Sequence, residues 1–380
     1  MAISVAGGVK PGKIIEIEQR LYRQLIVGKQ KSAAMFDELD AELDADANKL
    51  DIEREAILAR LAKQLQAKAV YEAVSKQLVD TVNNAIEHQL VSADLVLKHS
   101  GVNDKQILLL ELLQAKNLDL NRLRLVINDL SWLSRDLTNM VNSPAFRAHR
   151  PKGGDVQVTD LKLVLNYIGL ENLKVLIPYY CLRNWLPSGN ANLLWTTRKL
   201  WRFSIVSSIA TQALAKLHNI DMSLVYCVSL LNQLGTAVVL SNSARLFEKT
   251  WGGWLREASG SRDKELYDAV MATEFPSAQV CDHVMNFGAK LNWQLLGILG
   301  FEDSRLSQML HELDQTLNFC ELSPEAAIVA KAACYAKVMM LEELRQLEPQ
   351  EKRLMFDYFE FSEQELIRLK AQNYRKMDIL

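Results

Sequence analysis

Apolar side chains recur every three or four residues along most of this 380-residue chain, and this spacing constrains the fold more than any other feature. An α-helix brings residues at such intervals onto one face. Only 16 Gly and 8 Pro are present to interrupt helices, and no alternating β-branched runs lie between turn residues. The chain is therefore predicted to be all-α. The clearest segment predicts one long amphipathic helix from about Asp51 to His88, with apolar positions at Ile57, Leu58, Leu61, Leu65, Tyr71, Val74, Leu78, Val82 and Ile86.

Capping and breaking residues divide the rest of the chain into shorter predicted helices. Ser, Thr, Asn and Asp favour helix starts because their side chains accept hydrogen bonds from the free N–H groups of the first turn. The predicted caps are Ser92, Asn103, Asp119 and Thr159. Breaks are expected at Gly252-Gly253, Pro276 and Pro324. Further helices are predicted over Ile14–Val27, Leu133–Val141, Thr159–Tyr180, Trp195–Leu217 and Ser223–Leu240.

Composition and charge narrow the classes of function. Hydrophobic residues make up 49% and charged residues 24% of the chain, which is ordinary for a globular protein. The net charge of −2 provides no general positive field for nucleic acid. The 5 cysteines include no C-x-x-C pair, so we expect reduced thiols in the core rather than disulfides or a zinc site. No apolar run reaches about 18 residues and no signal-peptide pattern is present, so we expect no membrane span and a cytoplasmic location.

Two charged segments are candidate binding surfaces. Residues 37–55 are rich in Asp and Glu and are interpreted as a solvated helix face, with a docking face for a basic partner as the alternative. Residues 142–155 are predicted to be a loop that carries the candidate phosphate contacts Arg147, Arg150 and Lys152. Its Gly153-Gly154 pair lacks the preceding strand and the lysine spacing of a P-loop. Nucleic-acid binding through this loop therefore ranks last among the functions considered.

The residue types needed for catalysis do not form a recognised pattern. The chain has 6 histidines, none in an H-E-x-x-H motif or a His-Asp pair, and no G-x-S-x-G serine motif. The nearest metal-binding patterns are Asp282-His283 and His311-Glu312, which we interpret first as surface side chains. No catalytic residue, metal or cofactor is predicted from these patterns.

Several segments taken in order resemble the HDOD domain. The segment from Leu109 to Phe146 is similar to the opening helices of that domain and contains its Asn-Ser pair, here Asn142-Ser143. The later segments VTDLKLVLNYIGLENLKVLI, LWRFSIVSSIATQALAK and VSLLNQLGTAVVL resemble its following helices. The similarity covers roughly residues 101–345. It implies a helical bundle related to the HD phosphohydrolases, with a helical region at residues 1–100 and a helical tail at 346–380.

The resemblance also implies where metal ligands would stand in an HD enzyme. The first His corresponds to Phe203, and the His-Asp pair corresponds to Asn232-Gln233, although the nearby Gly235 is kept. A further His corresponds to the region of Ser277 and the last Asp to that of Cys334. These side chains are poor ligands for Mg²⁺ or Mn²⁺, which prefer carboxylate and imidazole groups. The resemblance therefore implies a degenerate site without a metal.

The leading hypothesis is a non-enzymatic regulatory module of a bacterial signalling pathway that binds protein partners or a small ligand. Asn232, Gln233 and Ser229 are candidates for hydrogen bonds to a nucleotide-like ligand, with satisfied buried amides as the equal alternative. A second hypothesis is a phosphohydrolase with relocated ligands at Asp282-His283 and His311-Glu312. A third is a helical scaffold that forms homo-oligomers through the helices of residues 1–100.

Overall fold

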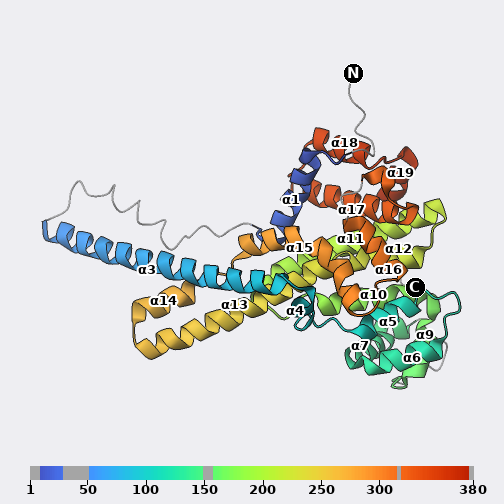
Figure 1. Ribbon diagram of the computed structural model, residues 1–380, viewed down its shortest axis with the longest axis horizontal. Helices are drawn as coiled ribbons and strands as arrows, with labels where there is room; N and C mark the ends of the chain where they lie inside the picture. Colours follow the sequence, from blue (N-terminus) through green and yellow to red (C-terminus); the bar gives the residue numbers. More distant parts are fainter. Residues whose placement is uncertain (1–8, 29–50, 149–156, 315–317, 376–380) are drawn as a thin grey trace.

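A computed structural model describes residues 9–28, 51–148, 157–314 and 318–375, and they form helices joined by short connections (Figure 1). No β-strand occurs in these described ranges, so the predicted all-α fold is confirmed. Most of the predicted acidic block, up to residue 50, lies outside the described residues, as do Arg150 and Lys152.

Five helices form the centre of the molecule. Helix α11 packs against α12 and α17, while α13 packs along α15. The apolar positions of α12 and of the first half of α13 are buried almost without exception, because neighbouring helices surround them. The bounds of these helices are α11 (Leu194–His218), α12 (Met222–Leu231), α13 (Leu234–Ser261), α15 (Ser277–Ile298) and α17 (Pro324–Glu343).

The single helix predicted over Ser223–Leu240 is wrong, because the chain turns at Asn232-Gln233 and starts a new helix at Leu234. The predicted break at Gly252-Gly253 is also wrong, since α13 continues to Ser261. Glycine weakens a helix without ending it, and here the indole N–H of Trp251 donates to the carbonyl of Val270 at 2.8 Å and holds the helix in place. Among the described residues, one stretch, Met222–Ser261, is long and apolar enough to cross a membrane, but 89% of its most apolar window is buried inside the protein.

A lobe of short helices precedes the centre. The first two helices of this lobe begin at the predicted caps: Asn103 forms a capping box with Gln106, and Asp119 caps the next helix. Asp160, not the predicted Thr159, caps α9, and Gly169 with a φ of 77° separates α9 from α10. The lobe contains α5 (Asp104–Leu112), α6 (Leu120–Asp129), α7 (Ser131–Val141), α8 (Pro144–Arg147), α9 (Leu161–Ile168) and α10 (Leu170–Trp185), followed by the 3-10 turn η2 (Ala191–Leu193).

A long arm projects from the centre (Figure 1). It consists of α3 (Asp51–Leu90), the second half of α13, and α14 (Lys264–Ala272), which pack side by side. The long helix predicted from Asp51 to His88 is thus confirmed, with two more residues at its end. Helix α4 (Ala93–Leu97) follows α3 where the arm joins the centre.

Helices from both ends of the chain pack onto the centre. Helix α1 (Gly12–Ile26) lies against α15, α17 and α18, and α19 lies against α11. The predicted boundaries at residues 100 and 345 therefore separate helices that share a core. The remaining elements of this end are α16 (Arg305–Asp314), the 3-10 turn η3 (Phe319–Glu321), α18 (Pro349–Tyr358) and α19 (Glu363–Lys370).

Candidate functional site

The turn between α12 and α13 carries Asn232 and Gln233, two of the residues that the resemblance places at metal-ligand positions. Asp221 caps the start of helix α12, because its carboxylate accepts from the N–H groups of Ser223 and Leu224, and Asn232 is the cap residue at the end of the helix. The side chain of Asn292, from α15, holds this turn. Its Nδ2 donates to the backbone oxygen and to Oδ1 of Asn232 at 3.0 and 3.1 Å, and its Oδ1 accepts from the N–H of Gly235 at 2.7 Å.

Gly235 is required by the packing of two helices. A Cβ placed on Gly235 would lie 1.9 Å from the carbonyl oxygen of Gly288 on α15, which is far inside van der Waals contact. Any side chain here would push α13 away from α15. The presence of this glycine is therefore explained by the helix crossing, whether or not a metal is bound nearby.

The other residues that the resemblance places at metal-ligand positions are buried or distant from this turn. Phe203 on α11 is 1% exposed, and Cys334 on α17 is fully buried. Burial raises the pKa of the Cys334 thiol well above its usual range, so the thiol is protonated. Ser277 lies at the start of α15, about 22 Å along that helix from Asn292, and the structure does not bring it to the turn.

Helix α1 occupies the space beside this turn. Its apolar face is buried, and Glu18 and Tyr22 lie next to that face. The Glu18 carboxylate is 2.5 Å from the ammonium of Lys337 on α17 and also pairs with Lys10. The hydroxyl of Tyr22 lies beside the side chains of Gln233 and Thr236. Asn232, Glu18 and Lys337 line one pocket of about 500 Å³.

The charges of this cluster stabilise one another. Glu18 and Lys337 are only 15% and 14% exposed. Burial alone would raise the pKa of the Glu18 carboxyl, but the ammonium groups of Lys337 and Lys10 lower it to about 2. Burial alone would lower the pKa of Lys337, and the Glu18 carboxylate raises it. Both groups are therefore ionised at neutral pH.

A second ion pair fixes the outer side of α1. The guanidinium of Arg20 binds both carboxylate oxygens of Glu351 on α18, at 2.8 and 2.9 Å, and donates to the backbone oxygen of Gln346 at 2.8 Å. This bidentate contact holds the pKa of Glu351 at about 2. The two ion pairs attach α1 to α17 and α18.

The sequence gives only weak signals for these residues. Glu18 and Tyr22 are four residues apart beside an apolar stripe, and Lys337 is the only charged residue in the segment AACYAKVMM. A lone lysine in an apolar helix indicates a buried partner. That partner lies in a helix more than 300 residues away, which no local pattern reveals.

The predicted loop residues and relocated ligands have structural roles in the described part of the chain. Asn142 bridges the two ends of the loop, since its side chain pairs with both the N–H and the carbonyl of Val158 at 2.9 and 2.7 Å. The guanidinium of Arg147 donates to the backbone oxygen of Asn142 at 2.7 Å. Residues 144–147, predicted to belong to a loop, form the short helix α8, and this contact turns the Arg147 side chain back towards the residues just before that helix.

The relocated-ligand hypothesis requires side chains that converge. His283, interpreted from the sequence as a surface side chain, is buried at 7% exposure and pairs with Asn83 of α3 at 2.7 Å. Glu312 instead accepts from the N–H and hydroxyl of Ser323 at 3.2 and 2.6 Å. His311 packs edge-on against Trp293. Within the described ranges, no group of three or more His, Cys, Asp or Glu side chains is placed to hold a metal ion.

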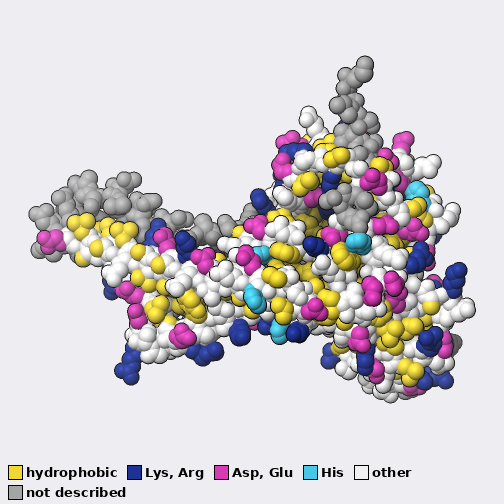
Figure 2. Space-filling model, viewed as in Figure 1, with side chains coloured by type: hydrophobic (Ala, Val, Ile, Leu, Met, Phe, Trp, Pro, Cys, Tyr) yellow, Lys and Arg dark blue, Asp and Glu magenta, His cyan; other side chains and the backbone are white. Residues whose placement is uncertain are grey.

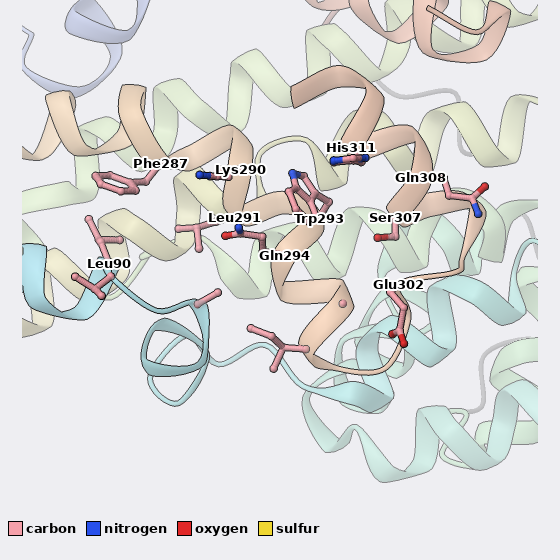
Figure 3. Close-up of a pocket in the computed structure, with 14 residues that line it drawn as sticks. Leu90, Phe287, Lys290, Leu291, Trp293, Gln294, Glu302, Ser307, Gln308 and His311 are labelled. Carbon is pink, nitrogen blue, oxygen red and sulfur yellow. The ribbon is translucent and has the colours of Figure 1, made fainter. Parts of the chain in front are cut away.

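A second pocket of about 590 Å³ lies between the end of α3, α15 and α16 (Figure 3). Leu90, Leu291 and the ring of Trp293 form an apolar floor. The indole N–H of Trp293 donates to Asp314 at 2.8 Å, and the His311 ring lies 4.4 Å from the indole. These contacts fix the indole in one orientation.

Residues 102–271 match the sequence model of the HDOD domain family. The match contains Phe203, Asn232 and Gln233, and it ends before Ser277 and Cys334. It confirms the resemblance over this range, which is shorter than the 101–345 expected. No curated protein matches the chain, and no solved structure matches it.

Proposed function

Because residues 102–271 of this chain are an HDOD domain, we propose that the chain is a regulatory module that acts by binding and does not hydrolyse phosphate esters. One observation carries the proposal. The turn that would hold the His-Asp pair of an HD enzyme carries two neutral amides, and a Glu18–Lys337 ion pair lies beside it.

The chemistry of the side chains supports this proposal. Phe203 has no lone pair for a metal, and the amides of Asn232 and Gln233 are weak replacements for imidazole and an ionised carboxylate. The ammonium groups of Lys337 and Lys10 would repel a divalent cation placed beside Glu18. Without a bound cation, no group lowers the pKa of a water molecule enough to make hydroxide near neutral pH.

We further propose that the module works in the cytoplasm and belongs to a signalling pathway, with proteins as its first class of partner. The side-chain Oδ1 of the half-buried Asn232 already accepts a hydrogen bond from Asn292, which favours a structural role for this amide over a contact to a nucleotide-like ligand.

A hydrolysis assay tests the proposal. Purified protein incubated with bis(p-nitrophenyl) phosphate and Mn²⁺, Mg²⁺ or Fe²⁺ is expected to release no more p-nitrophenol than the metal alone. Turnover that is lost in Asp282→Asn or His311→Ala, but kept in the control Asp303→Asn, would overturn it in favour of relocated ligands.

One observation favours homo-oligomerisation as a second candidate function. Leu58 and Leu65 of α3 are 61% and 58% exposed, and hydrophobic side chains are visible along this part of the arm (Figure 2). Deleting residues 1–100 would also remove α1 from the core, so point variants are the cleaner test. Leu58→Ser with Leu65→Ser is expected to lower the mass measured by light scattering, whereas the control Ile367→Ser on α19, 63% exposed, is not. An unchanged mass would remove this candidate.

A further inference from the structure

The groove between α3, α15 and α16 combines an apolar floor with opposite charges at its two ends. In Figure 3, Lys290 lies at one side of Gln294 and Glu302 at the other, with the indole of Trp293 between them. Lys290 and Glu302 are both exposed, and neither has an ion-pair partner in the described part of the chain. Both charges are therefore available to a ligand.

The floor of the groove is preorganised for an apolar side chain. Trp293 is half-buried and its ring is held by Asp314 and His311, so it loses little freedom when a ligand packs on it. Leu90 and Leu291 are 7% and 3% exposed and complete the floor. The volume of about 590 Å³ is in the range of ligand sites in proteins.

The amide side chains on the walls are suited to a peptide backbone. Gln294 makes no hydrogen bond in the described structure, and Gln308 uses only its Nε2, which donates to the backbone oxygen of Asp303 at 3.2 Å. A primary amide both donates and accepts, as a peptide group does. These side chains can therefore pair with the N–H and C=O groups of a bound chain.

The spacing of the backbone positions of Lys290 and Glu302 guides the length of the ligand. Glu302 lies beside Gly297, because a Cβ added at Gly297 would be 3.9 Å from the Cβ of Glu302. Gly297 follows Lys290 by two helical turns, which is about 10 Å along α15. An extended peptide covers about 10 Å in three residues.

We propose that this groove binds a short linear peptide of about three residues with free ends. The carboxylate of the peptide pairs with Lys290, its ammonium group pairs with Glu302, and its apolar central side chain packs on Trp293. The inference rests on the proposed function, in which the chain binds without catalysis, and it names a ligand class for that binding.

Isothermal titration calorimetry with the tripeptide Ala-Leu-Ala at pH 7 tests the inference. Binding of one peptide per chain is expected, and loss of either terminal charge is expected to weaken it about tenfold. The N-acetylated and C-amidated tripeptides measure these losses. Ala-Leu and a five-residue peptide, whose charges are spaced differently, are expected to bind more weakly.

Variants assign each charge to its partner. Lys290→Met should weaken binding of the free tripeptide but have no further effect on the C-amidated one, and Glu302→Gln should do the same for the N-acetylated one. Asp303→Asn, an exposed carboxylate next to Glu302 but outside the groove, is the control and should leave binding unchanged. Both substituted positions are exposed, so the variants are expected to fold, which circular dichroism checks.

Absence of binding, or equal binding of free and capped tripeptides, would overturn the inference and leave the proposed function standing. Phosphodiester hydrolysis would overturn the proposed function without changing the peptide result. The two failures are therefore distinguishable.

Discussion

The Glu18–Lys337 ion pair leads to a quantitative prediction about how α1 is attached. Replacing the carboxylate in Glu18→Gln leaves the buried ammonium of Lys337 without a counter-charge. The pKa of Glu18 is about 2, against an ordinary value of 4.5, which corresponds to roughly 3 kcal/mol of stabilisation of the ionised carboxylate. Breaking a buried pair by removing one partner costs about 3–5 kcal/mol, which agrees with this magnitude.

Urea unfolding followed by circular dichroism measures the effect on the free energy of unfolding. Glu18→Gln and Lys337→Met are each expected to lose roughly 3 kcal/mol. The double variant is expected to be more stable than the sum of the two losses predicts, because it leaves neither of these two charges unpaired. Additive losses in the double variant, or a loss below about 0.5 kcal/mol in either single variant, would refute the reasoning.

The thiol of Cys334 reports on the same contact in the native state. Cys334 is fully buried on α17 close to Lys337 and Glu18, so it should react with N-ethylmaleimide only when α1 leaves. Mass spectrometry of the peptide that contains Cys334 is expected to show faster labelling in Glu18→Gln than in the wild type. Exposed Cys320 serves as the internal control and should label at the same rate in both.

Three further outcomes are expected. The folded-state pKa values of Glu18 and Glu351 are depressed to about 2, so their contribution to the stability of the folded chain is complete above pH 4.5 and should be lost as the pH falls towards 2. Urea unfolding at several pH values should therefore show that the free energy of unfolding depends less on pH in Glu18→Gln than in the wild type. Gly235→Ala should prevent stable folding. In Gly253→Ala, by contrast, the added methyl group has no atom within 4 Å, so thermal unfolding should show a helix that is more stable by about 0.5–1 kcal/mol. Asn292→Ala should cost about 1–3 kcal/mol because it leaves buried polar groups of the α12–α13 turn unpaired, and an unchanged unfolding free energy would contradict that role.

Local patterns predicted most of the helices but not all of their ends. The long helix from Asp51 was predictable because its apolar positions repeat over many turns, and the cap at Asn103 was predictable because it belongs to a local capping box. The turn at Asn232 was missed, since most residues on both sides of it are apolar and the turn is held by Asn292 from a distant helix. The helix through Gly252-Gly253 was missed because tertiary contacts of Trp251 outweigh the weak helix propensity of glycine.

The candidate site was predictable only in part. The resemblance to a known family assigns Phe203, Asn232 and Gln233 to metal-ligand positions, because the residues around them keep their order and spacing, and this assignment stays a prediction. It could not show that α1 lies beside the turn, since the contact between Glu18 and Lys337 joins opposite ends of the chain. It also could not show that Ser277 lies far from the turn. Ser277 is at the start of α15, whereas Asn292, the residue of α15 that contacts the turn, is near the other end of the helix.

The metal content of the purified chain tests the central claim most directly. The protein is incubated with excess Mn²⁺ and passed through a gel-filtration column, and its metal content is measured by inductively coupled plasma mass spectrometry. The wild type and Glu18→Gln are both predicted to retain far less than one metal ion per chain. One or two retained ions per chain, lost on replacement of Asn232 or Gln233 by Ala, would contradict the proposal that the turn between α12 and α13 binds no metal ion.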